Sequence, residues 1–173
     1  MSGAPAKAKG KPDGRARGRP RTGARVAAVQ ALFQSEQTGE PAETVLDQFL
    51  RHRLTAPGAD GGYEDGKVPE ADARLFTRIL RAAAQEGEKL DALIGPLLSK
   101  GWTLDRLDPV LRALLRAAAA ELKDPAEPPA RVVINEYLDI AAGFLEDEAK
   151  RYANGVLDAL AHALRPAEFG APA

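Results

Sequence analysis

From Thr22 to the C-terminus, apolar residues recur at intervals of three and four, the period of an amphipathic α-helix. The segment after Asp108 shows this most clearly, because aspartate followed by proline is a favoured start for a helix. Its apolar positions fall on one face: Val110, Leu111, Leu114, Leu115, Ala118 and Leu122. A chain patterned in this way buries one stripe of each helix against the others, which predicts an all-α fold.

Composition also favours helices over strands. Hydrophobic residues make up 45% of the 173 residues, carried mostly by Ala, Leu and Val, whereas aromatic residues make up 5%. Strands favour aromatic and β-branched side chains, so this balance indicates helix. The length suits one domain with a tail. The absence of cysteine excludes disulfides, thiolate metal ligands and cysteine nucleophiles.

Prolines, glycines and capping residues predict the helix boundaries. A first helix is expected from Thr22, which can cap it, to Gly39, which can end it, and a second opens at Pro41. Residues 55–67 are predicted to form a loop. A third helix is expected from Pro69 and a fourth over 88–98, where Pro96 should kink the helix or mark its early part. A fifth is expected from Asp108, a sixth that ends at about Gly143, and a seventh over 147–164. The second and third helices are expected to bury Val45, Leu46, Phe49, Leu50, Leu75, Phe76, Ile79, Leu80 and Ala83.

Charge is distributed unevenly along the chain. Residues 1–25 carry eight basic residues and Asp13 as the single acidic one, a net charge of +7. Because the whole chain has a net charge of −1, residues 26–173 carry −8. Residues 1–21 are rich in glycine and proline and have little apolar surface, so they are predicted to form a disordered basic arm before a single helical domain over 22–173. Such an arm is either a solubility tail or a segment that binds nucleic acid.

The sequence contains no recognisable active site. His52 and His162 lack a second ligand at metal-binding spacing, and no glycine-rich phosphate loop follows a strand. The acidic run of residues 146–148 is typical of a helix start. We therefore expect no catalytic residue, metal or cofactor. Apolar stretches are too short for a signal peptide or a membrane helix, so a cytoplasmic protein without membrane association is expected.

Two segments carry candidate RNA contacts. Arg21 and Arg25 follow the basic arm and can contact phosphates. Gln30, among small apolar neighbours, can hydrogen-bond a base edge, while Phe33 belongs either to this surface or to the core. In the last helix, Lys150-Arg151-Tyr152 places two cations beside an aromatic ring, an arrangement that suits single-stranded RNA.

The alternative interpretation of Lys150-Arg151-Tyr152 has no RNA contact: a half-buried tyrosine lies beside two solvated basic side chains. Three residues after this tyrosine, Gly155 interrupts the helical pattern, where glycine costs about 1 kcal/mol relative to alanine. A close approach of two helices at Gly155 would offset that cost.

Several segments resemble the NusB family of transcription antitermination factors. Residues 24–33 (ARVAAVQALF) are similar to its first helix, and residues 133–136 (VINE) with Ala141-Ala142 to its sixth. Residues 152–158 (YANGVLD) resemble the start of its last helix, and Leu115-Arg116 and Glu121-Leu122 also fit. The resemblance runs in one order from about residue 22 to the end.

The resemblance implies two three-helix bundles that share a core, plus a connecting helix. It also implies binding of single-stranded boxA leader RNA together with NusE, a small-subunit ribosomal protein. The expected role lies in an RNA polymerase antitermination complex that reads through terminators in ribosomal RNA operons. Carried over by position, the RNA-binding residues are Arg21, Arg25, Gln30, Phe33, Lys150, Arg151 and Tyr152. The face for NusE is expected on the fourth and fifth helices, near Arg112, Arg116 and Glu121.

The chain departs from the family pattern in two places. Ala120 stands where many members have an aromatic residue, and Pro20, Thr22 and Gly23 spread the family's compact arginine cluster into a longer arm. Two other functions stay open. The same helical module occurs fused to RNA cytosine methyltransferases, but this enzyme function requires an α/β cofactor domain that the sequence does not contain. A protein-only helical adaptor is the other, and RNA binding that depends on the basic residues would distinguish it.

Overall fold

The structure is a computed structural model, and it describes residues 14–54, 71–124 and 128–170. These residues form α-helices and short 3-10 helices, and none of them forms a strand, so the prediction of an all-α fold is confirmed. The α-helices are α1 (Gly14–Thr38), α2 (Ala42–His52), α3 (Ala73–Gln85), α4 (Gly87–Ile94), α5 (Pro109–Lys123), α6 (Ala130–Phe144) and α7 (Asp147–Leu164). The 3-10 helices are η2 (Gly95–Leu97), η3 (Leu104–Arg106) and η4 (Pro166–Phe169).

Local capping residues set several of these boundaries. Gly39 follows the end of α1 with φ of 74°, a left-handed conformation that glycine adopts without strain. Asp108 caps α5 as predicted, because its Oδ1 accepts hydrogen bonds from the amides of Val110 at 2.8 Å and Leu111 at 3.3 Å. The bounds of α7 agree with the predicted 147–164.

One predicted boundary is wrong in each of the third and fourth helices. The third helix begins at Ala73 rather than near Pro69, because Asp72 has extended backbone and its side chain caps the first turn. The fourth α-helix ends at Ile94 rather than at residue 98. Pro96 has no amide hydrogen to continue the α-helical ladder, and the chain passes through the 3-10 turn η2 instead.

The N-terminal part of α1 also departs from expectation. The helix begins at Gly14, eight residues before Thr22, so residues 14–21 are helical rather than disordered. Pro20 lies inside it, and its carbonyl oxygen accepts a hydrogen bond of 2.7 Å from the amide of Asp72. The hydroxyl of Thr22 donates to Glu136 at 2.7 Å. These contacts attach the segment to residues distant in the sequence. The rest of the predicted arm, residues 1–13, and the predicted loop 55–67 lie outside the described residues.

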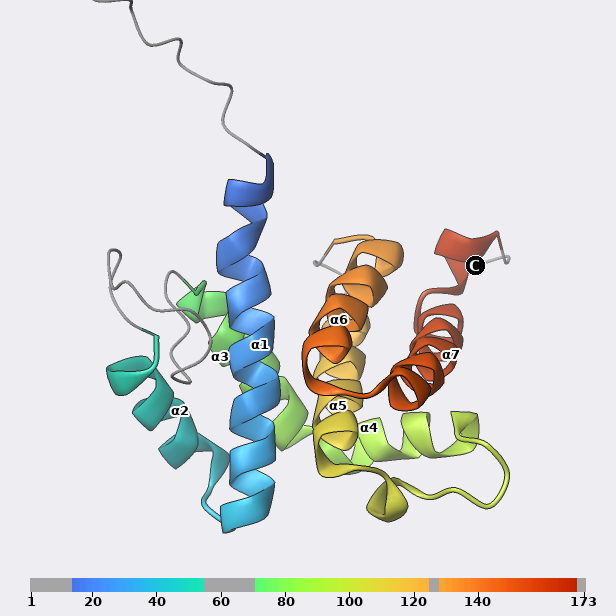
Figure 1. The fold of residues 1–173 in the computed structure, drawn as a ribbon, viewed down its shortest axis with the longest axis horizontal. Coiled ribbons are helices and arrows are strands. Elements are labelled where there is room, and N and C mark those ends of the chain that lie inside the picture. Colours follow the sequence, from blue (N-terminus) through green and yellow to red (C-terminus); the bar gives the residue numbers. More distant parts are fainter. Residues whose placement is uncertain (1–13, 55–70, 125–127, 171–173) are drawn as a thin grey trace, which may run out of the picture.

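The helices pack around α5, which contacts α1, α3, α4, α6 and α7 (Figure 1). Helices α1, α2 and α3 pack on one another on one side, and α5, α6 and α7 do so on the other. Small residues allow this central position, because α5 is buried on nearly every face and carries a run of four alanines, residues 117–120. The buried apolar residues form one cluster shared by both sides.

The predicted buried faces of α2 and α3 are confirmed at eight of nine positions, the exception being Leu50, which is 39% exposed. Gly155 does not mark a close approach of two helices. A Cβ atom built there meets nothing within 4 Å, and the residue is exposed. That interpretation of the glycine is therefore wrong.

Candidate nucleic-acid interface

The residues expected to contact RNA lie on two helices that both pack against α5. Those on α1 are Arg21, Arg25, Gln30 and Phe33, and those on the first turns of α7 are Lys150, Arg151 and Tyr152. In Figure 1, α5 and α6 stand between α1 and α7. The structure therefore gathers the α7 residues into one group and leaves the α1 residues as a second group.

Tyr152 is both partly buried, as the structural interpretation expects, and open to a surface cavity, as the RNA-binding interpretation expects. Its ring is half-buried and packs against the core, and its hydroxyl oxygen accepts a hydrogen bond of 2.9 Å from the amide of Ser99. The ring also lines an open cavity of about 480 Å³ with Trp102, Arg106 and Glu148. Tyr152 thus lines a surface hollow large enough for a nucleobase.

Both cations and carboxylates precede Tyr152 at the start of α7. Arg151 is exposed and Lys150 is half-buried, and both line a second cavity of about 320 Å³ together with Asn154. Residues 146–148, all acidic and exposed, precede them at the start of α7. Their negative charge suits the N-terminal end of the helix dipole, but it opposes an RNA phosphate at the same place.

Arg25 points into the protein rather than toward solvent. It is 2% exposed, and its guanidinium contacts Glu121 through Nη2 at 2.6 Å and through Nε at 3.0 Å to each carboxylate oxygen. The Tyr137 hydroxyl donates to the same carboxylate at 2.9 Å, and Glu136 lies 3.6 Å from Arg25 Nη1. Burial opposes the charge of Arg25, but the hydrogen bond and attraction from Glu121 outweigh it and raise its pKa.

This geometry corrects two site predictions. Arg25 was expected to meet RNA phosphates and Glu121 to meet a protein partner, yet each is 2% exposed and is paired with the other. Neither side chain presents its charge at the surface of this structure. The position of Arg25 after a basic arm suggested an outward cation, whereas the acids on α5 and α6 that draw it inward are about a hundred residues away.

The other α1 candidates are partly accessible. Arg21 and Gln30 are half-buried, and the Oε1 atom of Gln30 is buried without a hydrogen-bond partner among the described residues. Phe33 is half-buried and packs against the core cluster. These side chains remain candidates for RNA contact, with Phe33 also serving the core.

Two of the residues predicted to bind NusE, Arg112 and Arg116, share an ion-pair network with Glu36 near the end of α1. Arg112 is 8% exposed, pairs with Glu36, and donates from Nη1 to the carbonyls of Leu104 at 3.0 Å and Leu107 at 3.1 Å. Arg112 thereby joins α1, η3 and α5 inside the protein. The prediction that Arg112 contacts a protein partner directly does not agree with this burial. The sequence pattern around Arg112 did not indicate these acceptors, because the 3-10 turn η3 brings the carbonyls of Leu104 and Leu107 to its guanidinium.

Arg116 stays closer to the surface. It is 24% exposed, and its guanidinium contacts Asp91 at 2.8 Å and Glu36 at 3.1 Å. The hydrogen bond to Asp91 raises the pKa of Arg116. This side chain lines an open cavity of about 690 Å³ with Glu86, Glu88 and Lys89 at the junction of α3 and α4. The fourth and fifth helices therefore share a hollow of mixed charge.

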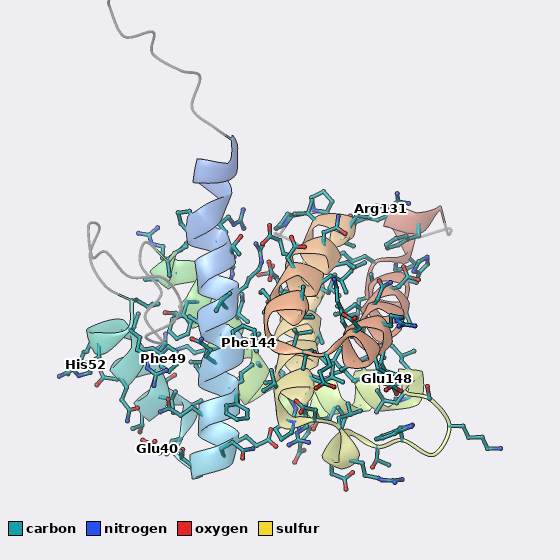
Figure 2. All side chains as sticks on the ribbon, in the orientation of Figure 1. Glu40, Phe49, His52, Arg131, Phe144 and Glu148 are labelled. Atoms are coloured by element: carbon teal, nitrogen blue, oxygen red, sulfur yellow. The ribbon has the colours of Figure 1, made fainter. Side chains whose placement is uncertain are left out.

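Two exposed aromatic residues were not among the predicted RNA contacts, and one of them, Trp102, lines the same cavity as Tyr152. Trp102 is 47% exposed, with the Arg106 guanidinium 5.4 Å from its ring centroid. Phe144, labelled in Figure 2 at the end of α6, is 45% exposed. Trp102 follows the turn at Gly101, and a single tryptophan beside a glycine turn was the available signal. Phe144 falls on the same helical period as the buried residues of α6, so the sequence gave no signal that it is exposed.

The described residues contain no group of histidines and acids that could hold a metal ion. His52 and His162 are exposed, and the ring of His162 stacks on Phe169 at 3.9 Å between centroids. None of the described helices is long and apolar enough to cross a membrane.

Comparison with known proteins gives the family. The model of the NusB family matches residues 22–162. The transcription antitermination protein NusB of Granulibacter bethesdensis is 59% identical over 154 residues, which cover 88% of this chain and 94% of that protein. The corresponding protein of Gluconobacter oxydans is 49% identical, over 82% of this chain and 86% of its own length.

Solved structures show the same fold. The structure of T. maritima NusB matches with a TM-score of 0.69 and 29% identity, covering 88% of this chain and 98% of that one. A structure of the antitermination factors NusB and NusE in complex with double-stranded RNA matches with a TM-score of 0.64 and 26% identity, covering 84% and 98%. The chain belongs to the NusB family.

Proposed function

We propose that this protein is a transcription antitermination factor that binds boxA leader RNA together with NusE. It would act within an RNA polymerase antitermination complex in ribosomal RNA operons, which implies a cytoplasmic location. The observation that carries the proposal is the family match over residues 22–162, which includes every candidate RNA contact except Arg21. Relatives named for antitermination match this chain over 86–94% of their own lengths, which does not favour a methyltransferase module.

The α7 group supplies the chemistry for single-stranded RNA. The half-buried ring of Tyr152 is held by Ser99 and can stack on an unpaired base, while Lys150 and Arg151 can meet the neighbouring phosphates. On α1, Arg21 adds a cation and Gln30 a half-buried side-chain amide. The basic residues that precede α1 add affinity without base selectivity.

The partner surface follows from charge and exposure. The acidic body, with −8 over residues 26–173, favours a basic protein. The hollow at the α3–α4 junction offers exposed Glu88, together with Arg116 as the accessible member of the predicted NusE residues. Arg112 and Glu121 act from inside by holding α5 in place.

The test is a titration of the full chain with boxA RNA, with the same RNA scrambled, and with its duplex form. Lys150→Gln/Arg151→Gln removes two cations from α7, and Lys89→Gln/Arg131→Gln removes two exposed cations elsewhere. We expect wild type to prefer single-stranded boxA RNA, the α7 variant to bind it more weakly, and the matched control to bind it like wild type. NusE binding without any RNA binding would instead support the protein-only adaptor.

A further inference from the structure

Three arginines form a row along the exposed face of α3. Arg74, Arg78 and Arg81 lie four and three positions apart, which places them on one side of the helix, with rises of about 6 and 4.5 Å between them. Arg78 and Arg81 are 49% and 50% exposed, and Arg74 is exposed as well. No acidic residue occurs between Ala73 and Gln85. We refer to these three residues as the α3 arginine row.

The α3 arginine row lines an open groove of about 450 Å³ between α2 and α3. Leu50, the residue of α2 that faces outward against expectation, contributes apolar surface together with Ala73 and Thr77. A groove with an apolar floor and guanidinium groups along it suits a nucleotide strand. Its sugars and bases can cover the apolar atoms while its phosphates meet the cations.

The charges of the row are accessible to a ligand. Arg81 Nε lies 2.8 Å from Glu43, and Arg78 Nε lies 3.4 Å from Asp124. Both pairs lie at the surface, where solvent and salt screen them, so a phosphate can compete with the carboxylates. Among the residues that the structure describes, the side chain of Arg74 has no hydrogen-bond or ion-pair partner.

The start of the row lies beside the turn of α1 that contains Pro20. The hydrogen bond of 2.7 Å from the Asp72 amide to the Pro20 carbonyl places the first turns of α1 beside the start of α3. Arg21 follows Pro20 directly, and Arg74 is two residues after Asp72. The start of α3 thus lies beside the turn of α1 that precedes Arg21. In the sequence, residues 1–25 have a net charge of +7, whereas residues 26–173 carry −8. This proximity, together with the charge of the row, favours as the occupant an RNA strand of the kind proposed above to bind at α1 and α7.

We propose that the α3 arginine row is an auxiliary RNA-binding surface. It holds phosphates of single-stranded RNA that flanks the element bound at α1 and α7. The inference rests on the proposed function, because it lengthens the same RNA track. Guanidinium–phosphate contacts carry no base information, so the row adds affinity and salt dependence without sequence preference.

The test compares boxA RNA alone with boxA RNA extended at both ends by oligouridine, each titrated over a range of salt concentrations. Arg74→Gln/Arg81→Gln removes two cations of the row and leaves Arg78 paired with Asp124. Lys89→Gln/Arg131→Gln is the matched control, and Figure 2 places Arg131 on the far side of the molecule from α2. At about 0.7 per phosphate contact on a single strand, the row variant should reduce the slope of log K against log salt by about 1.4 for the extended RNA. It should leave binding of boxA RNA alone unchanged, and the control should match wild type on both RNAs.

The other outcomes separate the inference from the function on which it rests. Equal slopes for wild type and the row variant on extended RNA, with wild type binding both RNAs, would overturn the inference alone. Failure of wild type to bind either RNA would contradict the proposed function and the inference with it. Equal loss on both RNAs, at an unchanged melting temperature, would place the row inside the main site and overturn its auxiliary role. Weaker NusE binding with unchanged RNA binding would assign the groove to a protein partner instead.

Discussion

The Arg25 guanidinium and the Glu121 carboxylate form a buried ion pair, 2.6 Å between Nη2 and Oε1, that joins α1 to α5. The Tyr137 hydroxyl donates to the same carboxylate and brings in α6. Three helices of the shared core therefore meet at one polar cluster. A cluster of this kind fixes which faces of the helices oppose one another, since each group would be unsatisfied in another register.

Arg25→Ala should strongly destabilise the fold. The substitution leaves the Glu121 carboxylate buried without its cation, which costs about 3–5 kcal/mol in the free energy of unfolding. Urea denaturation measures this cost, with Arg131→Gln as the control for loss of an exposed arginine. Adding Glu121→Gln to Arg25→Ala should recover part of the loss, because it removes the unpaired charge. A variant with unchanged stability but weaker RNA binding would return Arg25 to the RNA surface.

The same cluster predicts a loss of stability at high pH. Burial, and then the charge of Glu121, raise the pKa of Tyr137 well above its ordinary value of about 10. In the unfolded chain this tyrosine ionises near that ordinary value, so its contribution to stability is complete below about pH 10. Above it, the contribution falls by up to about 1.4 kcal/mol per pH unit. Denaturation of wild type and Tyr137→Phe from pH 8 to 11 should show the two stabilities converging above pH 10. A constant difference between the two free energies of unfolding over this pH range would contradict the predicted role of Tyr137.

Arg25 and Phe33 show what the sequence could indicate. Periodicity placed both on the first helix, and it identified Phe33 as a candidate for either the core or the surface. It could not orient Arg25, because charge suggests exposure unless a buried partner is known, and Glu121 is 96 residues away. Helix ends with local signals, such as Asp108 and Gly39, were predictable because their hydrogen bonds and backbone angles depend on adjacent residues.

Tyr152→Ala should weaken RNA binding by about 1–3 kcal/mol if a base stacks on the ring. Because the ring is also half-buried, we expect a moderate loss of stability in addition. Tyr152→Phe keeps the ring and loses only the hydrogen bond from Ser99, so its RNA affinity should stay close to that of wild type. Calorimetric titration and thermal unfolding of both variants separate these effects. A destabilised alanine variant with intact RNA affinity would make Tyr152 a core residue only.

Gly155→Ala should stabilise the protein by about 0.5–1 kcal/mol. The residue lies inside α7, and an added Cβ meets open space, so alanine lowers the entropy of the unfolded chain without a clash. Gly143→Ala, one residue before the end of α6, is a matched control where the same change should matter less. Thermal unfolding gives the stability. If the variant is more stable but binds RNA more weakly, an RNA backbone approaches α7 at this glycine.

RNA and NusE should bind with positive coupling. Covering part of the acidic body with a basic partner lowers the repulsion that residues 146–148 exert on RNA phosphates at α7. Coupling between two sites is typically about 1–3 kcal/mol and must be reciprocal. Saturating RNA should therefore tighten NusE binding by the same factor by which NusE tightens RNA binding. Calorimetry of both binary complexes and the ternary complex provides the three constants.

The variant that separates the two partners is Glu88→Lys, because Glu88 is exposed at the α3–α4 junction whereas Glu121 is buried. It should weaken the NusE step and leave binary RNA affinity nearly unchanged. Asp47→Lys makes the same charge change on α2, where its carboxylate is exposed beside Arg51, and should affect neither step. A ternary constant equal to the product of the two binary constants would show that the partners bind independently. In that case the acidic body does not limit RNA binding, even if both partners are confirmed.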